Sequence, residues 1–125
     1  MSKNILVISA SLRNGSNSDM LADEFMHGAL ESGNKAEKIT LHGKSINFCK
    51  GCLACQKTGR CVIKDDMAEI LPKMQQADVI CFASPVYFYD MCGQLKTFLD
   101  RTNPLFYRQN IIFTDIYFFT NCCRY

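Results

Sequence analysis

The feature that most constrains the fold is the passage from residue 4 to residue 21. An apolar, β-branched run over Asn4–Ser9 leads into a loop of hydroxyl, amide and glycine residues, and that loop runs directly into a helical pattern. A strand that opens onto a helix N-terminus gathers unpaired backbone N–H groups and the positive end of the helix dipole in one place. The sequence therefore predicts the start of an α/β unit with an anion site at its first turn.

This first loop supplies further donors for an anion such as a phosphate. Arg13 adds a full positive charge, and the hydroxyl and amide donors are Ser9, Ser11, Ser16, Asn17 and Ser18. A second interpretation stays open, in which Ser16 or Asn17 caps the helix and the other residues form an ordinary polar loop. The patterns G-x-G-x-x-G and G-x-x-x-x-G-K-[ST], which mark dinucleotide and nucleoside-triphosphate sites, are absent.

Length and composition limit the class of protein. The 125 residues fit a single domain, residues 1–125, with 48% hydrophobic and 21% charged residues, as in a soluble globular protein. A net charge of +2 argues against nucleic acid or a membrane surface as partner. No apolar run approaches ~20 residues and no signal peptide is visible, so we expect a cytoplasmic protein. In that reducing compartment, eight cysteines indicate metal, cluster or redox use.

Strand and helix patterns alternate along the chain. We expect strands at about 4–9, 36–41, 78–83 and 115–120, helices at about 18–32, 65–74 and 93–101, and loops at 42–64 and 84–92. Pro72 should kink or break its helix. The expected buried face of the first helix is Met20, Leu21, Phe25, Ala29 and Leu30. This order predicts a doubly wound parallel sheet, with ligands beyond the carboxyl ends of the strands.

The loop after the third strand is rich in aromatic residues. Pro85 stiffens the exit from the strand, and Tyr87, Phe88, Tyr89 and Met91 place flat or soft side chains at the ligand edge. Packing of these side chains against neighbouring loops is the alternative. Together with a phosphate site on the adjacent strand, the aromatic loop suits a planar ring that carries a phosphorylated tail. Flavin mononucleotide (FMN) meets this description.

The two loops carry motifs that resemble a known family. S-x-S-x-R-x-G-S-N-S follows the first strand, and S-P-V-Y-F-x-x-x-x-G-Q-L-K-x-F-L-D-R follows the third. This pairing is similar to the NAD(P)H-dependent FMN reductases of flavodoxin-like fold, over nearly the whole chain. The resemblance implies a strand order of 2-1-3-4 and an oxidoreductase in which NAD(P)H reduces bound FMN. A flavin, quinone or other small molecule would then be the electron acceptor.

The resemblance also implies roles for individual residues. The FMN phosphate would be held by Ser9, Ser11, Arg13, Ser16, Asn17 and Ser18, and the isoalloxazine ring would be lined by Pro85, Val86, Tyr87 and Phe88. Lys96 and Arg101 would belong to a helix surface or an interface. No catalytic side chain is assigned, because the cofactor carries the hydride chemistry in flavin enzymes.

Four cysteines, Cys49, Cys52, Cys55 and Cys61, form the pattern C-x2-C-x2-C-x5-C. A structural zinc usually takes two C-x2-C pairs that a longer hairpin separates, whereas successive x2 spacings resemble the wrapping of a 4Fe-4S cluster. The spacing is similar to that of iron-sulfur flavoproteins, a branch of the same reductase family in which the cluster passes electrons to FMN. Free thiols, redox pairs and zinc stay open as alternatives. Cys81 is expected in the core.

The chain ends earlier than the family pattern does. The resemblance implies a fifth strand and a last helix that these 125 residues do not contain, against the ~150 residues of a usual doubly wound domain, so we expect either a truncated chain or a second subunit that supplies the missing cover. The strand at 115–120 would then be a sheet edge without a lysine or proline to discourage pairing, so we expect a homo-oligomer, most simply a two-fold dimer. Two alternatives to an enzyme are a non-enzymatic electron carrier and an inactive fragment that keeps only the fold.

Overall fold

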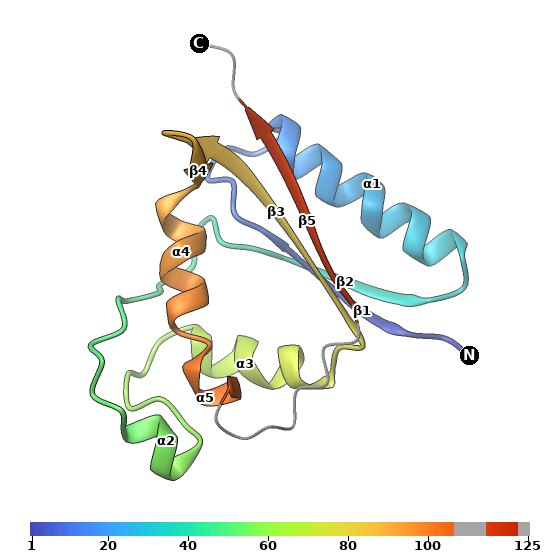
Figure 1. Ribbon diagram of the computed structural model, residues 1–125. Coiled ribbons are helices and arrows are strands. Elements are labelled where there is room, and N and C mark those ends of the chain that lie inside the picture. Colours follow the sequence, from blue (N-terminus) through green and yellow to red (C-terminus); the bar gives the residue numbers. More distant parts are fainter. Residues whose placement is uncertain (107–114, 123–125) are drawn as a thin grey trace.

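The computed structural model describes residues 1–106 and 115–122. Strands and helices alternate in the predicted way (Figure 1). The elements are β1 (Asn4–Ser9), α1 (Asn17–Glu31), β2 (Lys35–Thr40), α2 (Ala54–Thr58), α3 (Met67–Gln76), β3 (Val79–Tyr87), β4 (Asp90–Met91), α4 (Gly93–Asp100), α5 (Asn103–Phe106) and β5 (Asp115–Cys122).

The strands form one sheet in which β1 lies between β2 and β3. β1, β2, β3 and β5 are parallel, β5 pairs with β3, and β4 is a short antiparallel extension of β3. Ile5 in the centre is paired with Ala36 on one side and with Val79 on the other. The predicted flavodoxin-like order 2-1-3-4 is therefore confirmed, with β5 as the fourth parallel strand.

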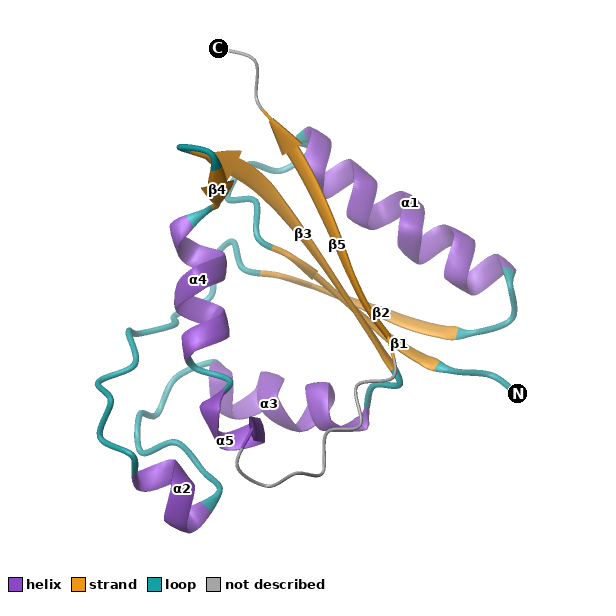
Figure 2. Ribbon diagram, viewed as in Figure 1, coloured by secondary structure: helices purple, strands orange, loops and turns teal. Residues whose placement is uncertain are grey.

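Helices cover both faces of this sheet, because the central strands are apolar on both sides. Along β1, Ile5 and Val7 pack toward α1, whereas Leu6 and Ile8 belong to the core beneath α3 and α4. Successive side chains of a strand point to opposite faces, so a strand that is buried on both faces is apolar throughout. Figure 2 shows α1 on one side of the strands and α3 and α4 on the other.

Aromatic contacts hold β5 against the rest of the sheet. Phe118 stacks on Phe82 at a centroid distance of 5.2 Å, and Phe119 lies 5.4 Å from Phe25 of α1. Within the part of the chain that the structure describes, β5 is an edge strand, and its residues Ile116, Tyr117 and Phe118 stay exposed.

Several local predictions are wrong. Pro72 does not break α3, which runs unbroken past it, because the buried Ile70, Leu71 and Met74 hold the helix against the sheet. The predicted loop 84–92 is in part a strand, since β3 continues to Tyr87 and pairs with β4. The segment 42–64 contains the short helix α2, and α5 follows α4; neither was predicted.

The predicted buried face of α1 is confirmed at Ala29 and at the partly buried Phe25, but it is wrong at Met20, Leu21 and Leu30, which are exposed. The helix packs through a row of small residues, Ser18, Ala22 and Ala29, with Phe25 and Met26 beside them. Small side chains let the helix axis lie close to the sheet, so the row that fits best against the strands is not the most apolar one.

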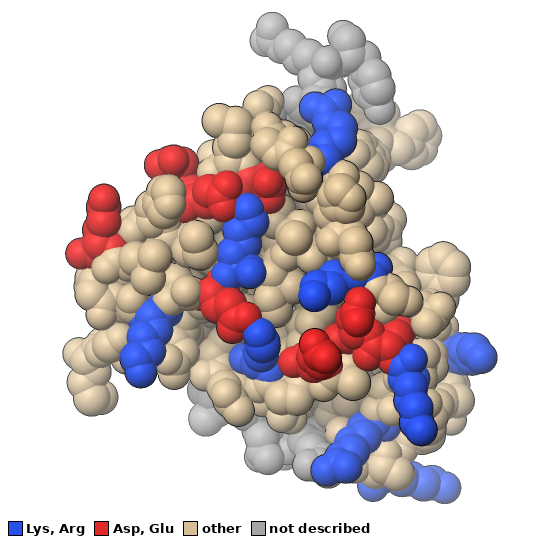
Figure 3. Space-filling model, turned by 180° about the vertical axis from the view of Figure 1, so that it is seen from behind, with Lys and Arg blue, Asp and Glu red and all other residues tan. Residues whose placement is uncertain are grey.

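The surface carries charges of both signs. In the view of Figure 3, acidic and basic side chains are interspersed over the face shown. A search of the described residues finds no helix of the length and apolar character that a bilayer span requires.

Candidate functional site

The first loop and the aromatic loop meet at the carboxyl end of the parallel strands. The carbonyl oxygen of Ala10, the first residue after β1, accepts a hydrogen bond from Gln94 Nε2 (2.8 Å) and a longer one from Cys92 Sγ (3.7 Å). The N–H of Ala10 donates to the carbonyl oxygen of Ala83 in β3 (2.8 Å). The predicted convergence of these two loops is therefore present, with α4 as the element that joins them.

The amino terminus of α1 presents N–H groups that have no partner among the described residues. Ser16 is the N-cap residue, and its Oγ accepts a hydrogen bond from the N–H of Asp19 (3.4 Å). Among the hydrogen bonds of the described residues, none involves the N–H of Asn17 or Ser18. Two free donors at the positive end of a helix dipole are the arrangement that binds phosphate in α/β proteins. By this criterion, a phosphate monoester such as that of FMN fits the site.

Asp19 connects the first loop to β1 and β2. Its carboxylate accepts hydrogen bonds from Ser9 Oγ (2.7 Å) and from the N–H of Gly15 (3.3 Å), and it forms an ion pair with Lys38 of β2 (2.9 Å). Burial opposes its ionisation, but the hydrogen bonds of Lys38, Ser9 and Gly15 leave the pKa of Asp19 below its usual value. Gly15 has a φ of 68°, a conformation that side chains disfavour.

The six residues predicted to hold a phosphate occupy different environments. Arg13 and Asn17 are exposed, and Ser16 is half-buried. Ser9, Ser11 and Ser18 are buried, and their hydroxyls make contacts inside the protein; Ser16 Oγ, for example, donates to Ser11 Oγ (2.6 Å). Of the six predicted residues, a ligand can thus reach Arg13 on the exposed edge of the loop, and Ser16 and Asn17 at the helix terminus. The buried serines shape that edge.

The second loop turns its aromatic side chains toward solvent. Pro85 is buried in β3, Val86 is half-buried, and Tyr87 is 42% exposed. Phe88 and Tyr89 form the tip of the hairpin between β3 and β4, with φ values of 48° and 66° and exposures of 93% and 96%. Packing against neighbouring loops is therefore the wrong interpretation for these two rings. They offer flat apolar surface at the ligand edge.

The four cysteines line one pocket at the other end of α4. The pocket is formed by the segment 49–63 and by the start of α5, and Cys49, Cys52, Cys55 and Cys61 all contribute to its wall. All four are free thiols. Burial raises the pKa of Cys55, and the neighbouring Cys61, Cys49 and Cys52 raise it further.

The structure shows no formed metal site at the four cysteines. Among the described residues, no group of three or more His, Cys, Asp or Glu side chains is placed to hold a metal ion. By its chemistry, a set of four thiols is the donor set of a zinc site and of a 4Fe-4S site alike. Cys49 Sγ also accepts hydrogen bonds from the N–H of Gly51 (3.5 Å) and from Asn103 Nδ2 (3.8 Å).

A buried ion pair adjoins this pocket, and its cation, Arg101, is part of the pocket wall. Arg101 donates to Asp65 through both terminal nitrogens, at 2.6 and 3.0 Å, and the two side chains are 1% and 2% exposed. The prediction that Arg101 lies on a helix surface is wrong, because the loop that carries Asp65 folds over it. Lys96 is exposed as predicted and pairs with Asp100 one turn later.

The family described as NADPH-dependent FMN reductase matches residues 3–114. The chain belongs to this family. The assignment confirms the resemblance that the two loop motifs carry, and it places this FMN reductase relative among proteins of flavodoxin-like fold.

Individual relatives agree with the assignment. An iron-sulfur flavoprotein of Methanocaldococcus jannaschii is 43% identical over 101 residues, 81% of this chain and 52% of that protein. An iron-sulfur flavoprotein of Archaeoglobus fulgidus is 36% identical over 104 residues, 83% of this chain and 47% of that protein. The NAD(P)H:quinone oxidoreductase from Methanothermobacter marburgensis has the same fold, with a TM-score of 0.67 at 20% identity over 82% of this chain and 54% of that one. The chain spans about half the length of the curated relatives it matches.

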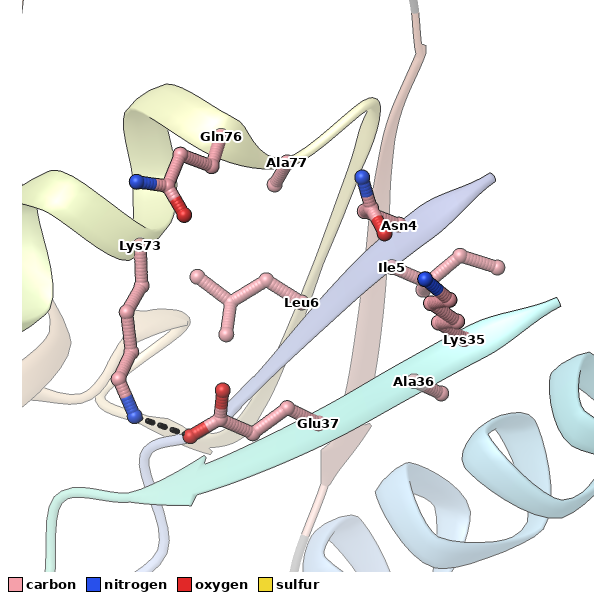
Figure 4. Close-up of a pocket in the computed structure, with 9 residues that line it drawn as sticks. All are labelled: Asn4, Ile5, Leu6, Lys35, Ala36, Glu37, Lys73, Gln76 and Ala77. Atoms are coloured by element: carbon pink, nitrogen blue, oxygen red, sulfur yellow. Dashed lines mark hydrogen bonds and ion pairs between the residues drawn. The ribbon is translucent and has the colours of Figure 1, made fainter. Parts of the chain in front are cut away.

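Another hollow in this FMN reductase relative lies away from both candidate sites. It has a volume of about 250 Å³ and is bordered by the amino-terminal residues of β1 and β2 and by the end of α3 (Figure 4). Lys73 and Glu37 form an ion pair across it. In open α/β sheets, ligands bind beyond the carboxyl ends of the strands. The two motifs lie at the opposite end of the sheet, so this hollow is not part of the candidate site.

Sequence reasoning missed several residues that organise the two sites: Asp19, Lys38, Asp65 and Gln94. A signal for Asp19 was available, since Ser16 and Asp19 are spaced as in a capping box. Asp65 and Arg101 lie 36 positions apart and meet only in the folded chain. Their pairing leaves no local trace in the sequence.

Proposed function

We propose that the chain forms the FMN-binding part of an oxidoreductase in which electrons from NAD(P)H pass through bound FMN to a small acceptor, such as a quinone or a free flavin. The observation that carries this proposal is the pair of free N–H donors at α1, beside Arg13, at the edge where the aromatic hairpin also lies. Membership of the FMN reductase family supports it.

The residues of the chain would bind and orient the cofactor. The N–H groups of Asn17 and Ser18 and the guanidinium of Arg13 would hold the phosphate, since both offer positive charge to an anion. The exposed hairpin around Phe88 would flank the ring. Gln94 would hold the two loops next to each other, because its amide donates a hydrogen bond to the carbonyl oxygen of Ala10. When bound, FMN supplies hydride and electron chemistry that no side chain of the chain needs to provide.

Comparison of FMN with riboflavin tests the phosphate site. Arg13→Ala should weaken FMN binding about tenfold, which corresponds to 1.4 kcal/mol, and should leave riboflavin binding unchanged, because only FMN carries a charge. Lys35→Ala is the matched control, since Lys35 is an exposed cation at the opposite end of the sheet. Equal losses of FMN and riboflavin would mean that the phosphate lies elsewhere.

Turnover separates an enzyme from an electron carrier. Protein that is loaded with FMN should oxidise NADH or NADPH continuously when a quinone or a free flavin is present. Bound FMN without turnover for any of these acceptors would contradict the enzyme and would favour the carrier.

We further propose that Cys49, Cys52, Cys55 and Cys61 bind a 4Fe-4S cluster. The observation that favours it is the placement of all four free thiols on one pocket wall, which also holds N–H donors to sulfur. α4 separates this pocket from the FMN site. Its eight residues span about 12 Å at 1.5 Å per residue. Such a cluster would exchange electrons with the flavin.

Anaerobic purification tests the cluster. The protein should be brown and contain iron and acid-labile sulfide, and Cys55→Ser should lose them while FMN stays bound. Cys81→Ser is the matched control, because Cys81 is buried in β3 with its pKa raised to about 12 by burial. Flavin absorption alone, in wild-type protein never exposed to air, would exclude the cluster.

A further inference from the structure

Arg101 is the only fully buried cation among the residues that the structure describes. It is placed between the segments that carry the cysteines. One terminal nitrogen donates to the carbonyl oxygen of Asn47 (2.8 Å) and to Asp65 (2.6 Å); the other donates to Asp65 (3.0 Å) and, weakly, to the carbonyl oxygen of Ile63 (3.5 Å). Asn47 precedes the first cysteine of the motif and Ile63 follows the last. A single side chain therefore fixes both ends of the cysteine segment to the end of α4.

One donor of this guanidinium is left over. Arg101 Nε is buried and has no hydrogen-bond partner within the described part of the chain. Buried donors without a partner are rare, and each indicates strain or a missing acceptor. Arg101 lines the pocket together with the four cysteines. The hydrogen bond to Asp65 raises the pKa of Arg101 against the opposing effect of burial, and the charge of Cys61 raises it further. A buried cation with one unfilled donor is therefore part of the wall of the cysteine pocket.

We propose that Arg101 is a positioning residue of the cysteine pocket, which holds the segment in its binding shape and raises the reduction potential of the cluster, and that Asp65 lowers this potential. The inference rests on the cluster proposed above. It goes beyond that proposal because it assigns opposite electrostatic roles to two residues outside the cysteine motif.

The direction of each effect follows from charge alone. With the proposed cluster bound, one electron from reduced flavin would raise the negative charge of the cysteine pocket by one unit, and no proton or leaving group would take part. A buried guanidinium stabilises the more negative state, since few water molecules screen it. The carboxylate of Asp65 destabilises the same, more negative state, because it is itself negatively charged. Loss of either residue by itself leaves the other charge buried without its partner, so the two substitutions should shift the potential in opposite directions.

The experiment is an anaerobic redox titration of the full chain, followed by electron paramagnetic resonance. The variants are Arg101→Gln, Asp65→Asn and Arg101→Lys, with Lys57→Gln as the matched control. Lys57 is a cation of the same segment, but it is exposed, screened by solvent and not part of the pocket wall. Thermal unfolding and FMN content, measured on the same samples, report the fold and the flavin site independently.

At the wild-type midpoint potential, Arg101→Gln should lower the ratio of reduced to oxidised cluster at least tenfold, and Asp65→Asn should raise it at least tenfold. A tenfold change corresponds to 59 mV for a one-electron couple. Arg101→Lys keeps the charge and should retain most of the wild-type potential, and Lys57→Gln should change the ratio less than twofold. These four results would support the roles of Arg101 and Asp65.

Shifts of both variants in the same direction, or no shift in either, would show that the pair is merely structural. If Arg101→Gln does not retain iron, the Asp65→Asn variant alone tests the inference. A cluster potential in Asp65→Asn that is at or below the wild-type value would then overturn it. Wild-type protein that binds FMN but neither iron nor sulfide would overturn the cluster, and this inference with it, while the FMN site stands.

Discussion

Replacement of Asp65 by Asn should remove a pH-dependent part of the stability of the fold. Asp65 is ionised inside the protein, where burial opposes the charge but hydrogen bonds from Arg101 and from the N–H groups of Asn47 and Met67 favour it. Together they lower its pKa from 3.8 to about 2. At 1.36 kcal/mol per pH unit, this difference corresponds to about 2 kcal/mol of folding free energy.

The sign follows from proton binding. Because the pKa of Asp65 is lower in the folded state, the unfolded chain binds more protons between pH 4 and pH 2. The contribution of Asp65 is therefore complete above about pH 4, and it is lost as the pH falls through about 2. The free energy of unfolding of the wild type minus that of Asp65→Asn should be constant near neutral pH and should decrease by about 2 kcal/mol toward pH 2.

Urea unfolding at a series of pH values measures this difference. Other carboxylates titrate in the same range, but they do so in both proteins and cancel in the subtraction. Asp100→Asn is the matched control, since Asp100 adjoins Arg101 in sequence but forms only an exposed pair with Lys96, so its removal should change stability by less than about 1 kcal/mol. A difference between wild type and Asp65→Asn that does not change from pH 7 to pH 2 would refute the reasoning.

Three further predictions concern other elements. Pro72→Ala should raise the free energy of unfolding by about 1 to 3 kcal/mol, because it restores a helical N–H within α3; a lower thermal midpoint would contradict this. Phe88→Ala should change stability by less than about 0.5 kcal/mol, since the ring is exposed, but should weaken FMN and riboflavin equally in a fluorescence titration; unchanged binding would exclude Phe88 from the ring site. We also propose that a second copy covers the edge of β5, where Ile116, Tyr117 and Phe118 are exposed, so sedimentation at low micromolar concentration should detect a dimer, and a monomer would refute it.

The sheet could be predicted because its central strands are buried on both faces. β1 and β3 are apolar at successive positions, and this pattern predicts that both strands lie in the interior of a parallel sheet. The convergence of the two loops followed from that arrangement, since parallel strands bring their carboxyl ends to one edge. The cysteine pocket was visible in the spacing of its four residues.

Long-range contacts could not be predicted in the same way. The burial of Arg101 depends on a loop that returns Asp65 to it, and no local pattern records such a contact. The buried face of α1 was predicted correctly at Ala29 but wrongly at its first turns, because hydrophobicity favoured Met20 and Leu21, whereas close packing favoured Ser18 and Ala22. Similarly, Ser9 was predicted to bind a phosphate through its hydroxyl, but in the folded chain that hydroxyl donates a hydrogen bond to Asp19.

Anaerobic titration with NADPH and NADH tests the central claim most directly. Protein purified without air and loaded with FMN is mixed with each nucleotide in steps, and its absorption spectrum is recorded. The account predicts that the flavin absorption is bleached in proportion to the nucleotide added, and that it returns when a quinone is supplied. A flavin spectrum that neither nucleotide changes would contradict the proposal that this chain accepts electrons from NAD(P)H through FMN.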